Sequence, residues 1–169
     1  MAVIRVLGID PGLAKTGWGI IEAEGSRLSY VAGGTIVTKQ ADPGAQRLKD
    51  IFDGLTSIVQ HYKPQHAAVE EVFVNNNARS SLKLGQARGI ALLVPSLHDI
   101  LVAEYSATTV KKAVVGTGRA EKAQVGHMIK VLLPRADVKG EDAADALAVA
   151  ICHAHTLQSS LTRTGAGYR

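Results

Sequence analysis

The sequence is poor in the residues on which several common classes of protein depend. Its single cysteine, Cys152, excludes a disulfide within the 169-residue chain and argues against a zinc cluster. Cys152 lies in the apolar run ALAVAICHAH, so we expect an inert, buried thiol in a reducing compartment. Aromatic residues make up only 4% of the chain, so the core must consist mostly of aliphatic side chains and alanine.

Long apolar runs are also missing from the sequence. No stretch approaches the roughly 18 unbroken apolar residues of a membrane span. The N-terminal segment MAVIRVLGID lacks the charged region and apolar core of a secretory signal. We therefore expect a cytoplasmic protein with no membrane segment. The formal net charge is +4, a mild excess that suits a polyanionic partner without requiring one.

Short apolar runs and amphipathic segments follow one another in an order typical of an α/β domain. Strands are predicted over residues 3–10, 17–25, 28–38, 66–74 and 100–107, helices over 42–62, 82–97, 109–115, 120–133 and 141–155, and a polar loop over 75–81. Three consecutive strands followed by strands that alternate with helices predict a five-stranded mixed sheet flanked by helices. We expect one domain over residues 1–156 and a disordered basic tail over 157–169.

Four acidic residues occupy positions that packing of a core does not explain. Asp10 ends the first strand, immediately before a Pro-Gly turn, and Glu70 interrupts an otherwise apolar strand. Asp142 and Asp145 lie on one face at the start of the last helix. Turn chemistry accounts for Asp10 taken alone, and the positive end of a helix suits Asp142. Asp145 is bracketed by alanines, so its carboxylate would be desolvated without a positive partner.

Taken together, the four carboxylates predict a site for divalent metal. Their hard oxygen ligands suit Mg²⁺, for which Mn²⁺ can substitute. Two such ions roughly 4 Å apart can activate a water molecule and stabilise a leaving oxygen in phosphodiester cleavage. Without metal, clustered like charges should raise the pKa of some of these carboxyl groups. We expect the sharp turn at DPG to hold Asp10 over the middle of the sheet.

Five segments of the sequence resemble one known family. In chain order they are GIDPGLAKTGWG, VEEVF, SSLKLGQARG, VKKAVVGTGRAEKAQVGHMI and EDAADALAVAICHAH, and they span residues 4–155. They resemble the RuvC family of Holliday-junction resolvases. The resemblance implies a ribonuclease-H-like fold and a homodimeric, Mg²⁺-dependent endonuclease of recombination and repair. Such an enzyme cuts four-way DNA junctions by paired symmetric incision and leaves 5′-phosphate and 3′-hydroxyl ends.

The resemblance also assigns roles to particular residues. The family's four metal-binding, catalytic acids fall on Asp10, Glu70, Asp142 and Asp145. The residues alone leave Glu70 and its neighbour Glu71 as alternatives, and the resemblance selects Glu70. It further implies two ions in each active site and a RuvA–RuvB branch-migration complex as a partner.

Basic residues gather near these motifs. The Gly-rich segment GTGRAEK contains Arg119 and Lys122 and opens onto a helix, an arrangement that suits phosphate. The resemblance implies that Lys111 and Lys122 contact DNA near the active site, and a lysine there can stabilise transition-state charge. It also implies that Phe73 stacks on a base at the centre of the junction. We include Arg79 among the expected DNA contacts.

The helix predicted over 82–97 carries apolar residues on most of its sides. A helix of that kind is usually buried on most sides. Gly85 and Gly89, four residues apart, would let a partner helix approach closely, and Leu82 lies beside them. We therefore predict a two-fold dimer interface on this helix. The alternative is a helix packed between the sheet and another helix of the same chain.

Three other functions remain open on the sequence. A ribonuclease-H-like nuclease acting on RNA or RNA–DNA hybrids would use the same carboxylates. An ATP-binding protein of the actin or sugar-kinase type would share the GID-G pattern of the first phosphate loop, but such chains are usually about twice as long. A junction-binding protein without catalytic activity would be expected to lack at least one of the four acids, and none is missing.

Overall fold

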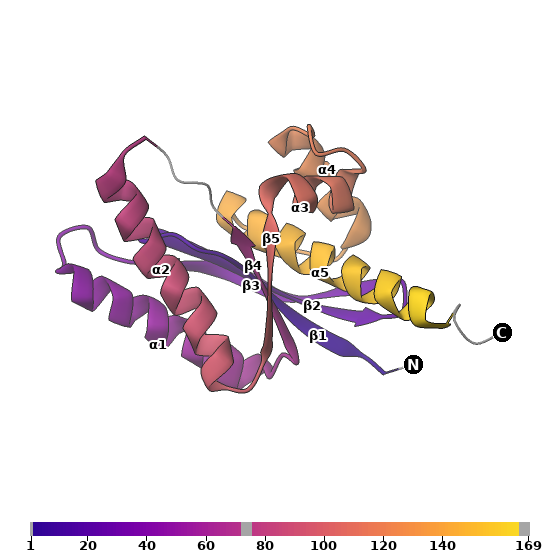
Figure 1. Ribbon diagram of the computed structural model, residues 1–169, viewed down its shortest axis with the longest axis horizontal. Coiled ribbons are helices and arrows are strands. Elements are labelled where there is room, and N and C mark those ends of the chain that lie inside the picture. The colour runs from indigo at the N-terminus through magenta and orange to yellow at the C-terminus, as the bar shows by residue number, and fades with distance from the viewer. Residues whose placement is uncertain (1, 72–75, 166–169) are drawn as a thin grey trace.

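A five-stranded sheet runs through the centre of the molecule (Figure 1). The computed structural model describes residues 2–71 and 76–165, except for the side chains of 163–165. The strands are β1 (Ile4–Asp10), β2 (Lys15–Glu24), β3 (Arg27–Val37), β4 (His66–Glu71) and β5 (Leu101–Ser106), and they lie in the order β3-β2-β1-β4-β5. β2 pairs antiparallel with β1 and β3, whereas β4 runs parallel to β1 and β5. The predicted mixed sheet is confirmed.

Helices cover both faces of this sheet (Figure 1). They are α1 (Gly44–Tyr62), α2 (Ala78–Leu97), α3 (Ala107–Val115), α4 (Lys122–Leu132) and α5 (Glu141–Gly165). α1 and α2 share a buried cluster with Leu7 and Ile9, and the other three helices share a second cluster with Val6. Successive side chains of a strand point to opposite faces, so neighbouring residues of β1 belong to different clusters.

Glycines allow α5 to lie unusually close to β1 and β2. A Cβ atom built on Gly8 would stand 1.9 Å from the carbonyl oxygen of Ala146, and one on Gly17 would stand 2.0 Å from that of Asp142. Gly17 is paired with Asp10 across the β1–β2 ladder. The absence of side chains at these two positions therefore brings the first turn of α5 directly over the end of β1.

Two helices differ from the sequence prediction by more than two residues. α2 begins at Ala78 inside the predicted loop, because the side chain of Asn77 accepts a hydrogen bond from the backbone N–H of Ser80 at 3.2 Å and caps the helix. α5 continues to Gly165, well beyond the predicted end near 155, so residues 157–165 are helical and are not the disordered tail that we expected. The hydroxyls of Ser159 and Thr162 donate to carbonyls of the preceding turn, so these polar residues fit within the helix. Residues 166–169 of the predicted tail lie outside the described part.

Two expectations, on membrane-spanning segments and on the single cysteine, can be compared with the structure. Among the residues that the structure describes, no helix is long and apolar enough to cross a membrane. Cys152 is buried in α5, as predicted, and burial raises the pKa of its thiol to about 11. A thiol with so high a pKa is protonated at neutral pH and reacts slowly.

Candidate active site

The four predicted acids lie on three elements that meet at one edge of the sheet. Asp10 ends β1 and Glu70 lies in β4, and the two strands are parallel neighbours with Ile9 beside Val69. Asp142 and Asp145 lie in the first turns of α5, which the contact at Gly17 holds against the β1–β2 pair. Parallel strands present their carboxyl ends at the same edge, so the strand acids and the helix acids meet there.

Asp10 interacts electrostatically with the other three carboxylates. Burial, followed by the charges of Glu70, Asp145 and Asp142, raises the pKa of Asp10 to about 8. Burial and the charge of Asp145 raise the pKa of Glu70, whereas its hydrogen bond with Asp10 lowers it. A protonated Asp10 that donates this hydrogen bond to an ionised Glu70 explains why the bond raises the pKa of Asp10 and lowers the pKa of Glu70. Burial is also the main reason that the pKa of Asp145 is raised.

The donor set suits a hard divalent cation. Its ligands are carboxylate oxygens that burial has partly stripped of water, and such groups gain most from a cation that replaces a shared proton. Within residues 2–71 and 76–165, however, no three Asp, Glu, His or Cys side chains are already arranged around one point as metal ligands. The carboxylates therefore lie in one region but are not yet arranged as a coordination shell.

Two lysines complete the charge arrangement. The Nζ atom of Lys122 lies 3.7 Å from Oδ2 of Asp145 and 3.4 Å from Oε2 of Glu141. The charge of Asp145, followed by that of Glu141, raises the pKa of Lys122. Lys111 and Lys122 both act on Glu70, where their positive charges favour the ionised carboxylate and lower its pKa. Lys122 thus lies beside Asp145, and the contact of both lysines with DNA stays a prediction.

Glu141 lies beside Lys122 as well, although nothing in the sequence marks it as a site residue. It precedes Asp142 at the start of α5, where an acidic residue is common for reasons of helix stability alone. Only its distance from Lys122 distinguishes it from an ordinary residue of a helix start. The sequence signal for this contact is therefore weak.

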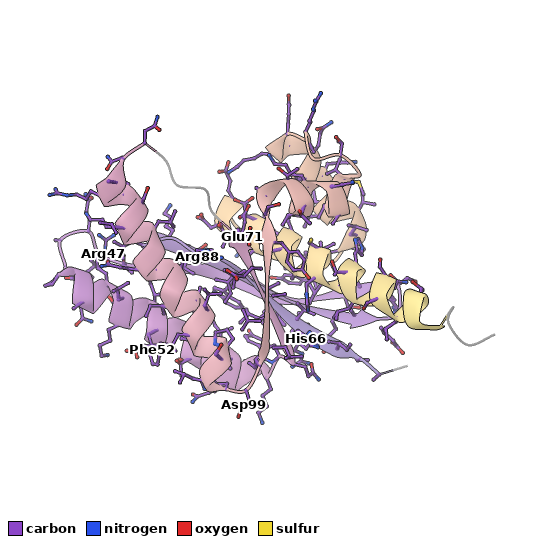
Figure 2. All side chains as sticks on the ribbon, in the orientation of Figure 1. Arg47, Phe52, His66, Glu71, Arg88 and Asp99 are labelled. Carbon is purple, nitrogen blue, oxygen red and sulfur yellow. The ribbon has the colours of Figure 1, made fainter. Side chains whose placement is uncertain are left out.

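Glu71 and Lys112, which follow Glu70 and Lys111 in the chain, are more exposed than these two residues. Glu71, labelled in Figure 2, is exposed at the end of β4, whereas Glu70 is partly buried. Lys112 is exposed and lines a different hollow beside His155, whereas Lys111 is partly buried. Alternation along the strand and rotation along the helix separate each pair of neighbours.

The structure describes two of the three remaining predicted DNA contacts. Arg119 is exposed in the turn before α4, close in sequence to Lys122, and Arg79 is exposed in the first turn of α2. Phe73 lies outside the described residues. By contrast, Arg88 of α2, labelled in Figure 2, forms an ion pair with Glu104 of β5 and so joins the helix to the sheet.

One side of α2 is apolar and exposed. Leu82, Gly85 and Gly89 are exposed along this side, and a Cβ atom on either glycine would meet no other atom within 4 Å. Ala87 and Ala91 are buried against the rest of the chain. The predicted interface residues thus lie together on the side of the helix that the chain itself does not cover, which leaves the dimer as a prediction.

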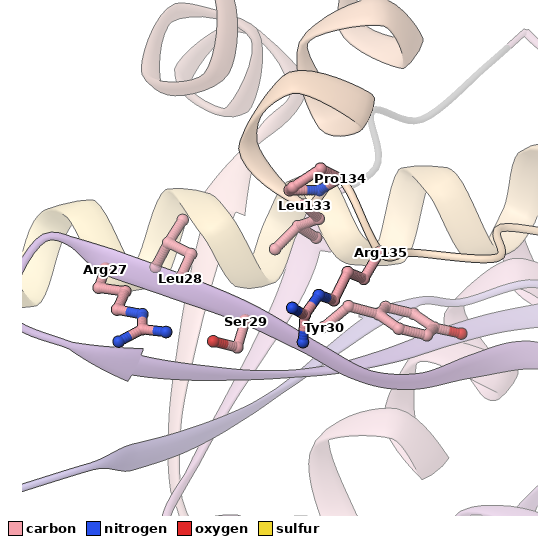
Figure 3. Close-up of a pocket in the computed structure, with 7 residues that line it drawn as sticks. All are labelled: Arg27, Leu28, Ser29, Tyr30, Leu133, Pro134 and Arg135. Atoms are coloured by element: carbon pink, nitrogen blue, oxygen red, sulfur yellow. The ribbon is translucent and has the colours of Figure 1, made fainter.

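Two hollows flank the region after α4. One, of about 460 Å³, lies between α4 and the start of α5 and includes Lys122 and Asp145. The other, of about 290 Å³, lies between β3 and the segment after α4, and Figure 3 shows Arg27, Tyr30 and Arg135 around it. None of the four acids lines the second hollow, so we assign the chemistry to the first region.

The family model described as "Crossover junction endodeoxyribonuclease RuvC" matches residues 6–153. This chain belongs to the RuvC family. RuvC of Sinorhizobium medicae is 54% identical over 164 residues, which cover 97% of this chain and 98% of that protein. RuvC of Azorhizobium caulinodans is 57% identical over 153 residues, which cover 90% of each chain.

Solved structures agree with this RuvC assignment. Thermus thermophilus RuvC in complex with a Holliday junction substrate superimposes with a TM-score of 0.87 at 28% identity, covering 93% of this chain and 96% of that one. The yeast mitochondrial Holliday junction resolvase Ydc2 superimposes with a TM-score of 0.68 at 15% identity, covering 95% of this chain and 81% of that one, and shares the fold. The predicted ribonuclease-H-like fold is confirmed, and membership of the RuvC family removes the ATP-binding alternative.

Proposed function

We propose that this RuvC-family chain resolves four-way DNA junctions as a metal-dependent endonuclease. The observation that carries the proposal is the cluster of Asp10, Glu70, Asp142 and Asp145, in which burial and mutual repulsion hold a proton on Asp10. A structural ion pair would not need four acids at one edge of a sheet. Such a cluster is the pattern expected of a nuclease that awaits its cation.

The four carboxylates would hold two Mg²⁺ ions, with Mn²⁺ as a substitute. Bound there, the ions supply an activated water and stabilise the leaving oxygen of a phosphodiester. Asp10 must release its proton to solvent before all four carboxylates can act as ligands. Lys122, held beside Asp145, keeps a positive charge where the phosphate develops negative charge.

Resolution takes two cuts on strands related by two-fold symmetry, and one chain carries one set of acids. We infer that two chains pair through Leu82, Gly85 and Gly89 of α2 and present two such sets. Lys111, Arg79, Arg119 and the stacking residue Phe73 would contact the junction. A RuvA–RuvB branch-migration complex would deliver it.

Cleavage of three matched substrates tests this function. A synthetic four-way junction, a linear duplex with the sequence of one arm and an RNA–DNA hybrid are offered to the purified protein, with Mg²⁺ or with a chelator. We expect paired symmetric cuts in the junction alone, and only with Mg²⁺. Preferential cleavage of the hybrid would favour a ribonuclease, and metal-independent cutting would contradict the carboxylate site.

A further inference from the structure

The groove between α4 and the start of α5 extends beyond the residues that the proposed chemistry uses. Its volume is about 460 Å³, within the range of roughly 300–1,000 Å³ typical of small-ligand pockets. Small and apolar side chains form much of its wall, including Ala123, Val138 and Ala144. Lys122 and Asp145 lie in the same wall, so the groove is continuous with the active site.

One face of α4 supplies both the charge and the open space of this groove. Lys122, Gly126 and Lys130 all line it, and their spacing of four residues places them on one side of the helix. Eight residues of helix separate the two lysines by about 12 Å. Between them, a Cβ atom on Gly126 would meet no other atom within 4 Å. The groove therefore has a lysine toward each end of this helix face, with Lys122 paired to Glu141 and Asp145 and Lys130 at the other end, and it is open in its middle.

We propose that this groove is a substrate subsite, which seats the base of a nucleotide next to the scissile phosphate. This inference rests on the nuclease function proposed above. The base lies on the apolar wall at Gly126, and Lys130 contacts a phosphate further along the same strand. A strand of DNA supplies the required combination of flat apolar surface and regularly spaced negative charge, and it already passes Lys122 in order to reach the acids.

Position 126 permits a variant that fills the groove without disturbing the fold. Gly126→Leu places a side chain in open space, and replacing glycine within a helix favours the helical state. His127→Leu is the matched control, because His127 is exposed on the same helix and does not line the groove. Thermal unfolding of both variants verifies that neither has lost stability.

Junctions with a single abasic site at the first or second nucleotide on either side of the cut provide the test. For wild type and His127→Leu, we expect one of these positions to lower kcat/KM by about tenfold relative to the intact junction. Gly126→Leu should cut the intact and the abasic junction at the same reduced rate, because the subsite is already filled. If Gly126→Leu retains the wild-type ratio of rates, or if no abasic position affects the wild type, the subsite is wrong.

Thiol crosslinking locates the nucleotide independently of activity. Gly126→Cys and His127→Cys are each mixed, in chelator, with junctions that carry a disulfide-tethered base at the same four positions. Cys152 is buried with a pKa of about 11 and does not compete. We expect crosslinking at Gly126→Cys to exceed that at His127→Cys by about tenfold at the position identified above. Equal yields would overturn the subsite, whereas a wild-type protein that cuts no junction would overturn the proposed function itself.

Discussion

At the scale of single residues, burial and neighbouring negative charges make ionisation of Asp10 unfavourable. Asp10 is held with a pKa of about 8, against its ordinary value of 3.8. Between these pH values the folded protein keeps a proton that the unfolded chain releases. The metal-free protein therefore loses stability as the pH rises from about 4 to about 8. The divalent cation proposed for this site would remove this cost, because it would bind the ionised form.

Asp10→Asn should abolish cleavage and spare junction binding, since one metal ligand is lost while repulsion of DNA falls. It should also stabilise the metal-free protein by about 2 kcal/mol at pH 8, and the gain should vanish near pH 4. Denaturant unfolding in chelator across this pH range measures the difference, and Mg²⁺ should stabilise wild type more than the variant.

The other three acids provide the comparison for cleavage. Glu70→Gln, Asp142→Asn and Asp145→Asn should likewise bind the junction without cutting it, whereas Glu71→Gln, changed at an exposed neighbour, should cut normally. Near wild-type cutting by two of the four acid variants would show that the metal site is wrongly assigned.

Lys122→Ala should slow cleavage more than it weakens binding, because Lys122 lies beside Asp145. Lys112→Ala, which removes an exposed charge on the far side of α3, should affect neither strongly. Single-turnover cleavage and binding at several salt concentrations separate the two effects. Each phosphate contact that is lost should reduce the salt slope by about 0.9. Equal, small effects of both variants would mean that the Lys122 segment is only a solvated surface.

At the scale of elements, the contact between α5 and the β1–β2 pair places two of the four acids. Gly17→Ala would bring a Cβ atom to 2.0 Å from the carbonyl oxygen of Asp142, so the first turn of α5 must shift. We expect a loss of about 1–3 kcal/mol in stability and a fall in cleavage of about tenfold or more. Gly44→Ala, where a Cβ atom meets nothing within 4 Å, is the control for thermal unfolding and cleavage. Full activity of Gly17→Ala would show that this contact does not position Asp142.

A second set of contacts ties α5 to β4 and β5. Nε2 of His153 lies 2.9 Å from Nδ1 of His66, and its Nδ1 lies 2.7 Å from the hydroxyl of Tyr105. Burial, followed by the neighbouring His66, lowers the pKa of His153 to about 4 from its ordinary 6.5. The folded protein keeps His153 neutral while the unfolded chain binds a proton below pH 6.5, so stability falls as the pH decreases from about 6.5 to about 4.

His153→Gln should remove the share of this pH dependence that comes from His153, which we expect to reach roughly 2 kcal/mol. His66, whose pKa is also lowered by burial, leaves a smaller dependence in the same direction. The comparison is made in the Asp10→Asn background, because the proton on Asp10 acts in the opposite direction. Denaturant unfolding between pH 4 and 7 measures it, with His127→Gln as an exposed control. An unchanged slope in His153→Gln would mean that another group is responsible.

At the scale of the whole molecule, one side of α2 is left uncovered by the rest of the described chain. Leu82 is 71% exposed, and the two glycines beside it leave space for a second helix. Leu82→Glu should convert a dimer into single chains that nick one strand without paired incision. Light scattering or sedimentation checks the mass, and a wild-type mass of one 17.8 kDa chain at micromolar concentration would contradict the dimer. Lys83→Glu, at an exposed neighbour, controls for added charge.

Much of the architecture follows from patterns that are local in the chain. Apolar periodicity identified the order of the strands and helices that the structure describes, because the period of burial differs between the two kinds of element. The ends of elements were harder to predict. The start of α2 depends on one cap at Asn77, and the end of α5 depends on serine and threonine hydroxyls that bond to the helix backbone.

The sequence by itself determined the family and the mixed sheet, since these rest on residue types, order and spacing. It also predicted the four acids, although only the resemblance to the RuvC family selected Glu70 over Glu71. The tertiary structure alone decided that Glu141 shares Lys122 with Asp145. It also decided that Asp10 keeps a proton near neutral pH. Desolvation and Coulomb interactions depend on distances between segments far apart in the chain, and close contacts such as that of Gly17 with α5 set those distances.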